Sequence, residues 1–154
     1  MKNQVIDSID DLVALKGKVL GESRWIVISQ EIIDRFADAT FDHQWIHTDT
    51  ERALVESPYK STIAHGYLTL SLLPTLLDDI IDVNNLEHLV NYGIKDMTYK
   101  SAVLSGDRIR LIATLSKAKD IGNICKAEIH CRFEIEGQDT PALEGSVIYL
   151  YYFK

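Results

Sequence analysis

The chain has 154 residues, 46% hydrophobic and 25% charged, which is the size and composition of one ordinary globular domain. Its net charge of −7 argues against a nucleic-acid surface, and no apolar run reaches the length of a membrane span. The acidic start MKNQVIDSIDD is unlike a secretory signal. We therefore expect a single cytoplasmic domain over residues 1–154, with no nucleic-acid or membrane partner.

The first part of the chain has helical patterns. Ser8, followed by acidic and then apolar residues, predicts a short capped helix that ends at Gly17. A strand is predicted over 24–28. Ser29 is the expected N-cap of a helix over 30–39, whose apolar residues repeat at helical spacing beneath an acidic outer face.

The helical period breaks over residues 40–49, where TFDHQWIHTD is dense in groups that donate, accept or titrate, as expected of a loop that carries chemistry. A short helix is predicted over 50–56. Residues 67–81 are apolar nearly all round, which indicates a helix buried on most sides. Pro74 should kink or split that helix.

The second half of the chain has the period of strands. Residues 124–135 alternate apolar with polar and charged side chains, which requires a sheet with one wet face, and 107–119 and 143–153 are similar. Cys125 and Cys131 are in phase with the apolar set, which favours buried structural thiols over redox or metal roles. The implied fold class is α+β, with a twisted antiparallel sheet wrapped around one long helix.

The basic residues are unevenly distributed. Residues 61–94 contain no Lys or Arg, whereas 95–126 contain Lys95, Lys100, Arg108, Arg110, Lys117, Lys119 and Lys126. One interpretation is a local anion site, and the other is a set of solvated outer faces of strands.

Two segments could carry chemistry, and the first is DHQWIH at residues 42–47. A carboxylate and an imidazole five residues apart on a loop can converge on one water molecule. Asp42 would then take a proton while His47 orients or relays it. By spacing alone, an Asp and a His this close are more often a structural loop pair.

The same segment allows a metal interpretation. His43 and His47 could be an i, i+4 pair with Asp49 as a third ligand, but such a pair needs a helix. Trp45 and the lost helical period argue against one. We expect no metal here, and a surface or structural role for His43.

The second segment is TIAHG at residues 62–66, just before the predicted buried helix. The first amides of a helix have no intrahelical partner and can stabilise a developing oxyanion. Gly66 would let a substrate carbonyl approach the backbone closely. A glycine at this place can also serve only packing or a tight turn.

Together, and ahead of a strand-rich half, the two segments resemble the MaoC-like dehydratase family, which includes the R-specific enoyl-CoA hydratases and NodN-like proteins. The hydratase pattern has an Asp, an Asn-Pro step, a His and a downstream Ala, and Asp42, His47 and Ala53 are in register with it. The AHG of residues 64–66 matches the family's second block.

The chain departs from that pattern at two places, although the resemblance extends from about Ser29 to the end. Phe41 stands where Gly is usual, and Gln44 and Trp45 replace Asn-Pro. These departures look like the NodN-like branch and leave the Asp and His intact.

The resemblance implies a hot dog fold, in which an antiparallel sheet wraps a central helix, and a homodimer with the acyl-thioester tunnel near the subunit contact. It implies Asp42 as general base, His47 as the residue that holds the same water and can return a proton, and the Gly66 amide as donor to the thioester oxygen. The implied reaction is (R)-specific, reversible hydration of a 2-enoyl-CoA to a 3-hydroxyacyl-CoA. Coenzyme A is then part of the substrate, and no other cofactor is expected.

Two other activities stay open. A thioesterase would direct water at the carbonyl carbon and release free thiol from a saturated acyl-CoA. A non-catalytic acyl-CoA-binding or regulatory module would keep the tunnel without turnover, although a binder has no use for the proton-transfer pair of Asp42 and His47.

Overall fold

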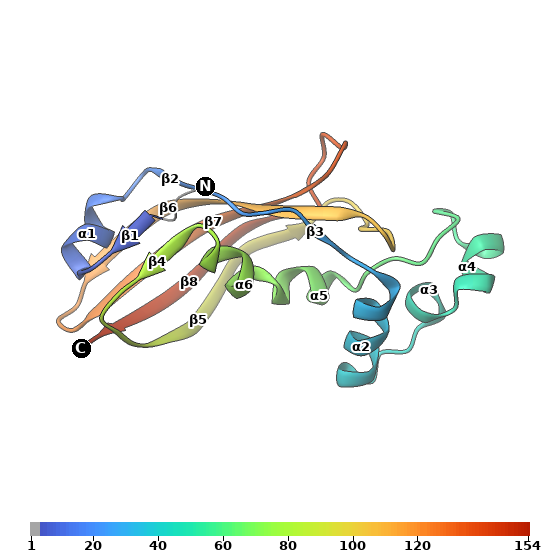
Figure 1. Cartoon of the computed structure of the whole chain (residues 1–154), viewed down its shortest axis with the longest axis horizontal. Helices are drawn as coiled ribbons and strands as arrows, with labels where there is room; N and C mark the ends of the chain where they lie inside the picture. The colour runs from blue at the N-terminus through green and yellow to red at the C-terminus, as the bar shows by residue number, and fades with distance from the viewer. Residues whose placement is uncertain (1–3) are drawn as a thin grey trace.

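A computed structural model describes residues 4–154, so the first three residues of the predicted domain lie outside the described part. An antiparallel sheet curves around helices α5 and α6, and helices α2 to α4 extend beyond one end of the sheet (Figure 1). In chain order the elements are β1 (Gln4–Ile6), α1 (Ile9–Ala14), β2 (Val19–Glu22), β3 (Ile26–Val27), α2 (Gln30–Thr40), α3 (Trp45–Thr48), α4 (Thr50–Glu56), α5 (Gly66–Ser71), α6 (Leu73–Asp78), β4 (Ile81–Val83), β5 (Leu86–Tyr99), β6 (Arg108–Asp120), β7 (Ile124–Ile135) and β8 (Leu143–Phe153).

The main sheet has the strand order β2-β6-β7-β8-β5, with β3 also paired to β6 and every neighbouring pair antiparallel. Along β7 and β8, buried residues alternate with half-exposed ones, as the sequence predicts. Cys125 and Cys131 on β7 are buried and free. The α+β architecture and the buried thiols are thus confirmed.

The amino-terminal strands differ from the prediction. Only Ile26 and Val27 of the expected strand over 24–28 form β3, and β2 was not predicted. Both strands are short and lie along β6, with Val19 opposite Thr114 and Ile26 opposite Ile109. Their conformation is therefore set by pairing with a distant strand rather than by a local alternation.

The predicted central helix is two helices. Pro74 lies in the first turn of α6, where its missing N–H costs no hydrogen bond, so the apolar run breaks between α5 and α6. Leu68 and Leu76 are buried, whereas Tyr67 and Pro74 are exposed. The helices are therefore buried on one side only, which corrects the expectation of burial on most sides. No helix within residues 4–154 is long and apolar enough to cross a membrane.

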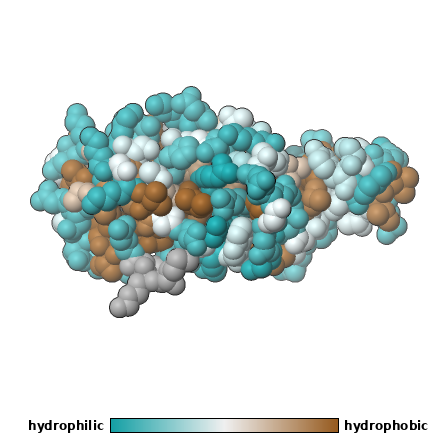
Figure 2. Space-filling model, turned by 90° about the horizontal axis from the view of Figure 1, so that it is seen from above, coloured by the Kyte–Doolittle hydropathy of each residue, from teal (hydrophilic) through white to brown (hydrophobic). Residues whose placement is uncertain are grey.

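Helices α2, α3 and α4 form a helical extension, which contains the segment over residues 40–49 that the sequence predicts to be functional. Helix α4 occupies the predicted residues 50–56, but the expected loop over 40–49 contains the single-turn helix α3. Leu54 and Val55 on α4 are exposed, and the end of the extension shows hydrophobic patches among hydrophilic residues (Figure 2). The extension carries Asp42 and His47 next to the start of α5.

Candidate active site

Asp42 follows a left-handed turn at the end of α2. Phe41 is the C-terminal cap of α2, with φ of 62°, and the residue is 87% exposed. Glycine is preferred in this conformation because it has no Cβ to strain the backbone. The turn of this chain would suit the Gly that the hydratase pattern has here, and Phe41 adopts it at an energetic cost.

The second departure from the pattern falls on the start of α3. Gln44 is the N-cap of α3 but makes no side-chain capping bond, and Trp45 is the first helical residue. Asn at the N-cap and Pro at the next position are residues that favour helix initiation. In this chain, Trp45 instead packs against Arg52 of α4, whose guanidinium lies 4.4 Å from the ring centroid.

Helix α3 holds the His47 side chain in a buried position. His47 Nδ1 is 2.7 Å from the carbonyl oxygen of Ile63. A carbonyl oxygen can only accept, so Nδ1 carries the hydrogen and Nε2 of the neutral ring has a free lone pair. Gln30 of α2 fixes the backbone by donating to the His47 carbonyl at 2.7 Å.

The charge state of His47 follows from its surroundings. Burial is the largest effect and lowers the pKa of His47; the nearby His65 also lowers it, while the Ile63 carbonyl and Asp42 raise it. The net result is a pKa below the ordinary value of 6.5. His47 is therefore neutral at neutral pH and can accept a hydrogen bond at Nε2.

Sequence reasoning gave no role to His65, yet this residue joins the two halves of the site. Its Nε2 lies 2.9 Å from the backbone carbonyl oxygen of Asp42 and 3.9 Å from the Asp42 carboxylate. Its ring stacks on that of His47 with the centroids 3.7 Å apart. The one sequence signal was its place in the AHG block.

Asp42, His47 and His65 each offer a side-chain atom within 4.8 Å of the other two. These distances alone would permit a metal ion. However, the Asp42 carbonyl accepts from His65 Nε2, so this nitrogen carries a hydrogen and has no lone pair to offer. The hydrogen bonds therefore favour an acid–base site over a metal site.

The other metal arrangement considered from the sequence does not form. His43 is about half exposed, with its Nε2 3.8 Å from Asp38. Asp49 caps α4, accepting from the Arg52 backbone N–H at 2.9 Å. Among residues 4–154, neither side chain is grouped with His47 at metal-binding distance, and the expected surface role for His43 is consistent with its exposure.

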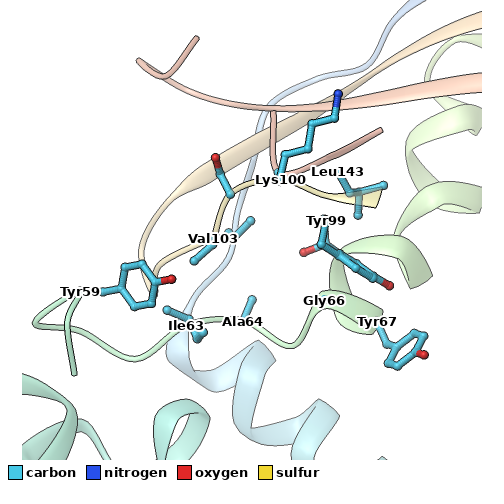
Figure 3. Close-up of a pocket in the computed structure, with 13 residues that line it drawn as sticks. Tyr59, Ile63, Ala64, Gly66, Tyr67, Tyr99, Lys100, Val103 and Leu143 are labelled. Atoms are coloured by element: carbon cyan, nitrogen blue, oxygen red, sulfur yellow. The ribbon is translucent and has the colours of Figure 1, made fainter. Parts of the chain in front are cut away.

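Gly66 is the first residue of α5 and lines a pocket of about 450 Å³ between the helix and the end of β5 (Figure 3). A Cβ on Gly66 would come 2.7 Å from the ring of Tyr99, so the approach requires glycine. Helix α5 has six residues, so its dipole adds little and the amide itself would be the donor. Asp42 and His47 do not line this pocket.

The cluster of basic residues lies mostly in ion pairs, which favours the interpretation as solvated strand faces. Its members contact carboxylates in the pairs Arg108–Glu136, Arg110–Glu22, Arg110–Glu134, Lys117–Glu128, Lys95–Glu128 and Lys100–Glu144. A phosphate would have to compete with these acids. Lys100 alone of this cluster lines the pocket at Gly66.

The curved antiparallel sheet and the helices inside it define a hot dog protein, and Asp42 lies beside the buried imidazole of His47. The model of the MaoC like domain matches residues 11–132. The chain belongs to this MaoC-like family, as the two sequence segments indicated.

Named relatives agree with this assignment. The chain is 39% identical over 149 residues to 3-hydroxyacyl-thioester dehydratase Z of Mycobacterium tuberculosis (strain ATCC 25618 / H37Rv), covering 96% of this chain and 98% of the relative. It is 39% identical over 148 residues to nodulation protein N of Rhizobium leguminosarum bv. viciae, covering 95% and 92%. The R-hydratase PhaJ1 from Pseudomonas aeruginosa shares the fold, with a TM-score of 0.73 at 17% identity over 90% of this chain and 83% of that one. The family and these relatives support a hydratase or dehydratase activity.

Proposed function

We propose that the protein is an (R)-specific hydro-lyase that adds water reversibly to a 2-enoyl-CoA and gives a 3-hydroxyacyl-CoA. The observation that carries the proposal is the grouping of Asp42 and His47 around His65, with one side-chain atom of each within 4.8 Å of the others. A carboxylate beside a neutral imidazole can accept both hydrogens of one water molecule. Proton transfer by such groups contributes about 10²- to 10⁴-fold to the rate.

In the hydration direction, Asp42 takes a proton from the water while His47 Nε2 accepts its second hydrogen and orients the oxygen. The oxygen forms a bond to C3 of the enoyl group as the C2–C3 double bond moves toward the thioester carbonyl. A proton then returns to C2 from the same pair of residues. Dehydration is the reverse, so no oxidant or other cofactor is consumed.

The thioester oxygen becomes negative during this reaction, and we assign the Gly66 N–H as its donor. The pocket at Gly66 and the absence of room for a side chain there support this assignment. One well-placed donor to an oxyanion contributes about 3 kcal/mol to the transition state. Because Asp42 and His47 lie beyond the lining of this pocket, the substrate would have to reach from Gly66 past His65 to the catalytic pair.

Hydration of crotonyl-CoA by the purified protein tests the proposal, followed as the loss of enoyl-thioester absorbance. Asp42→Asn and His47→Gln should each lower kcat at least about 100-fold while the circular dichroism spectrum stays unchanged. His43→Gln is the matched control, since this exposed imidazole lies in the same segment and contacts Asp38. Unchanged rates in both site variants would contradict the assignment. Thiol release from a saturated acyl-CoA would indicate a thioesterase, and tight binding without turnover a binding module.

We also propose that two copies of the chain pair along β5. This 14-residue strand is the edge of the sheet, and Leu89, Val90, Tyr92 and Ile94 on it are exposed. A long apolar edge strand can pair with another strand, and a twofold axis would join the two β5 strands.

The free thiols also fit the expected cytoplasmic location.

Light scattering coupled to size-exclusion chromatography tests the dimer. Ile94→Lys should shift the mass from dimer to monomer, because it places a charge on the proposed contact. Val27→Lys on β3, which also replaces an exposed apolar side chain but lies away from β5, should leave the dimer intact. A monomeric native protein would refute the proposal.

A further inference from the structure

His65 is buried in the site but takes no part in the proposed proton transfers. Its exposed fraction is 3%, and two of its contacts reach different residues of the proposed catalytic pair. One is the hydrogen bond from Nε2 to the Asp42 backbone carbonyl, and the other is the ring stacked on His47. Asp42 and His47 therefore share one neighbour that touches both.

The remaining nitrogen of His65 shows that packing alone does not explain the residue. Nδ1 is buried and has no hydrogen-bond partner among residues 4–154. A buried polar atom without a partner destabilises a fold, and a hydrocarbon ring would fill the same space beside Phe36 without that cost. The imidazole is thus explained by its other nitrogen, the one that donates to Asp42.

The contact bears on Asp42 because this residue lies between helices α2 and α3, outside regular secondary structure. Asp42 follows the strained turn at Phe41, and its side chain is 43% exposed. The hydrogen bond from His65 fixes the backbone from which the Asp42 carboxylate projects. The same ring lies at 25° to the His47 ring and limits the tilt of that imidazole.

We propose that His65 is a positioning residue, which holds the Asp42 carboxylate and the His47 ring in the mutual arrangement needed to bind one water molecule. The catalytic part of this proposal rests on the proposed hydration. A misplacement of catalytic groups by about 1 Å can cost about 100-fold in rate without any loss of binding. The predicted signature is therefore a fall in kcat rather than a rise in KM.

Two substitutions separate the donor from the ring. His65→Gln keeps a nitrogen donor near the position of Nε2 but loses the aromatic ring, and His65→Phe keeps a ring but loses the donor. We expect His65→Phe to lower kcat for crotonyl-CoA about 10- to 100-fold, with KM within about twofold of the wild type. We expect the kcat of His65→Gln to lie, on a logarithmic scale, at least halfway from that of His65→Phe to that of the wild type. His43→Phe, which removes an exposed imidazole of the same segment, is the matched control and should keep wild-type kcat.

Stability distinguishes positioning from a structural role. His65→Phe removes an unpartnered buried nitrogen but also the hydrogen bond to the Asp42 carbonyl. Because these two effects oppose each other, the melting temperature should stay near that of the wild type even as kcat falls. If both variants lose activity in parallel with melting temperature, His65 is merely structural. If both keep wild-type kcat, the proposal is wrong. Should His65→Phe fail to fold, His65→Met fills the site without a donor and replaces it in the comparison.

Amide hydrogen exchange of residues 41–44 provides a readout that does not depend on turnover. These amides should exchange faster in His65→Phe than in the wild type, and at wild-type rates in His65→Gln. If the wild type does not hydrate enoyl-CoA but this exchange pattern holds, the proposed function fails while the anchoring of Asp42 stands. If the wild type is active and exchange is identical in all variants, the anchoring is refuted.

Discussion

His47 and His65 stack face to face, with ring centroids 3.7 Å apart and planes inclined by 25°. Burial is the largest penalty on charging His47, and the neighbouring His65 adds to it. Both effects lower the pKa of His47. This arrangement therefore keeps the His47 imidazole neutral, with a lone pair free at Nε2.

The first prediction concerns pH. Since the folded pKa of His47 lies below the ordinary 6.5, the unfolded chain binds this proton more readily than the folded one. The stability that the neutral His47 provides is fully present above about pH 6.5. It is lost as the pH falls through the folded pKa. The acid limb of kcat/KM should lie below pH 6.5 for the same reason.

Urea unfolding of the wild type and His47→Gln between pH 8 and pH 5, about the range in which histidine titrates, measures this effect. The free energy of unfolding of the wild type should fall more steeply with decreasing pH than that of the variant. Parallel curves would mean that His47 titrates alike in both states.

The second prediction concerns Gly66 and Tyr99. A Cβ at position 66 would lie 2.7 Å from the Tyr99 ring, so Gly66→Ala must displace that ring, which is half exposed and can move. We expect a loss of about 1 kcal/mol in the free energy of unfolding and a lower kcat/KM, because the ring shifts within the pocket. In a Tyr99→Ala background, Gly66→Ala should cost little stability. Additive effects of the two changes would contradict the contact.

The third prediction uses the turn before Asp42. Phe41→Gly should raise the free energy of unfolding by about 0.5–1 kcal/mol, because φ of 62° suits glycine and strains a residue with a Cβ. Phe41→Ala is the control, since it removes the exposed ring but keeps the Cβ. Equal stabilisation by both substitutions would assign the effect to the exposed ring rather than to the backbone.

The fourth prediction concerns the two thiols. Burial raises the pKa of Cys131 to about 12 and also raises the pKa of Cys125. Only the thiolate reacts with disulfide reagents. At about pH 8, where a free cysteine is partly ionised, the native protein should react far more slowly than the unfolded chain. Rapid modification of either thiol in the native state would show that its strand opens.

Local signals made much of the fold predictable. Ser29 caps α2 by accepting from the Ile32 amide, and the alternation over 143–153 forms β8 at the expected bounds. These elements are specified by residues close together in sequence. The hot dog architecture followed from the family resemblance.

The missed features depend on contacts that are distant in sequence. β2 lacks a pattern of its own and forms against β6. The turn α3 lacks a side-chain cap at Gln44, so no sequence signal marked its start. His65 donates a hydrogen bond to a backbone carbonyl 23 residues earlier. Every residue has such a carbonyl, so the residue types do not reveal this partner. Likewise, Tyr99 shows no sign in sequence that its ring covers Gly66.

His65 and Gly66 are consecutive residues that face different parts of the site. The His65 ring packs on His47, while Gly66 lines the pocket at the end of β5. One peptide bond separates the two, so a displacement of the Gly66 backbone also moves the base of the His65 side chain. A molecule that fills the pocket at Gly66 should therefore also change the position of the His65 ring relative to His47.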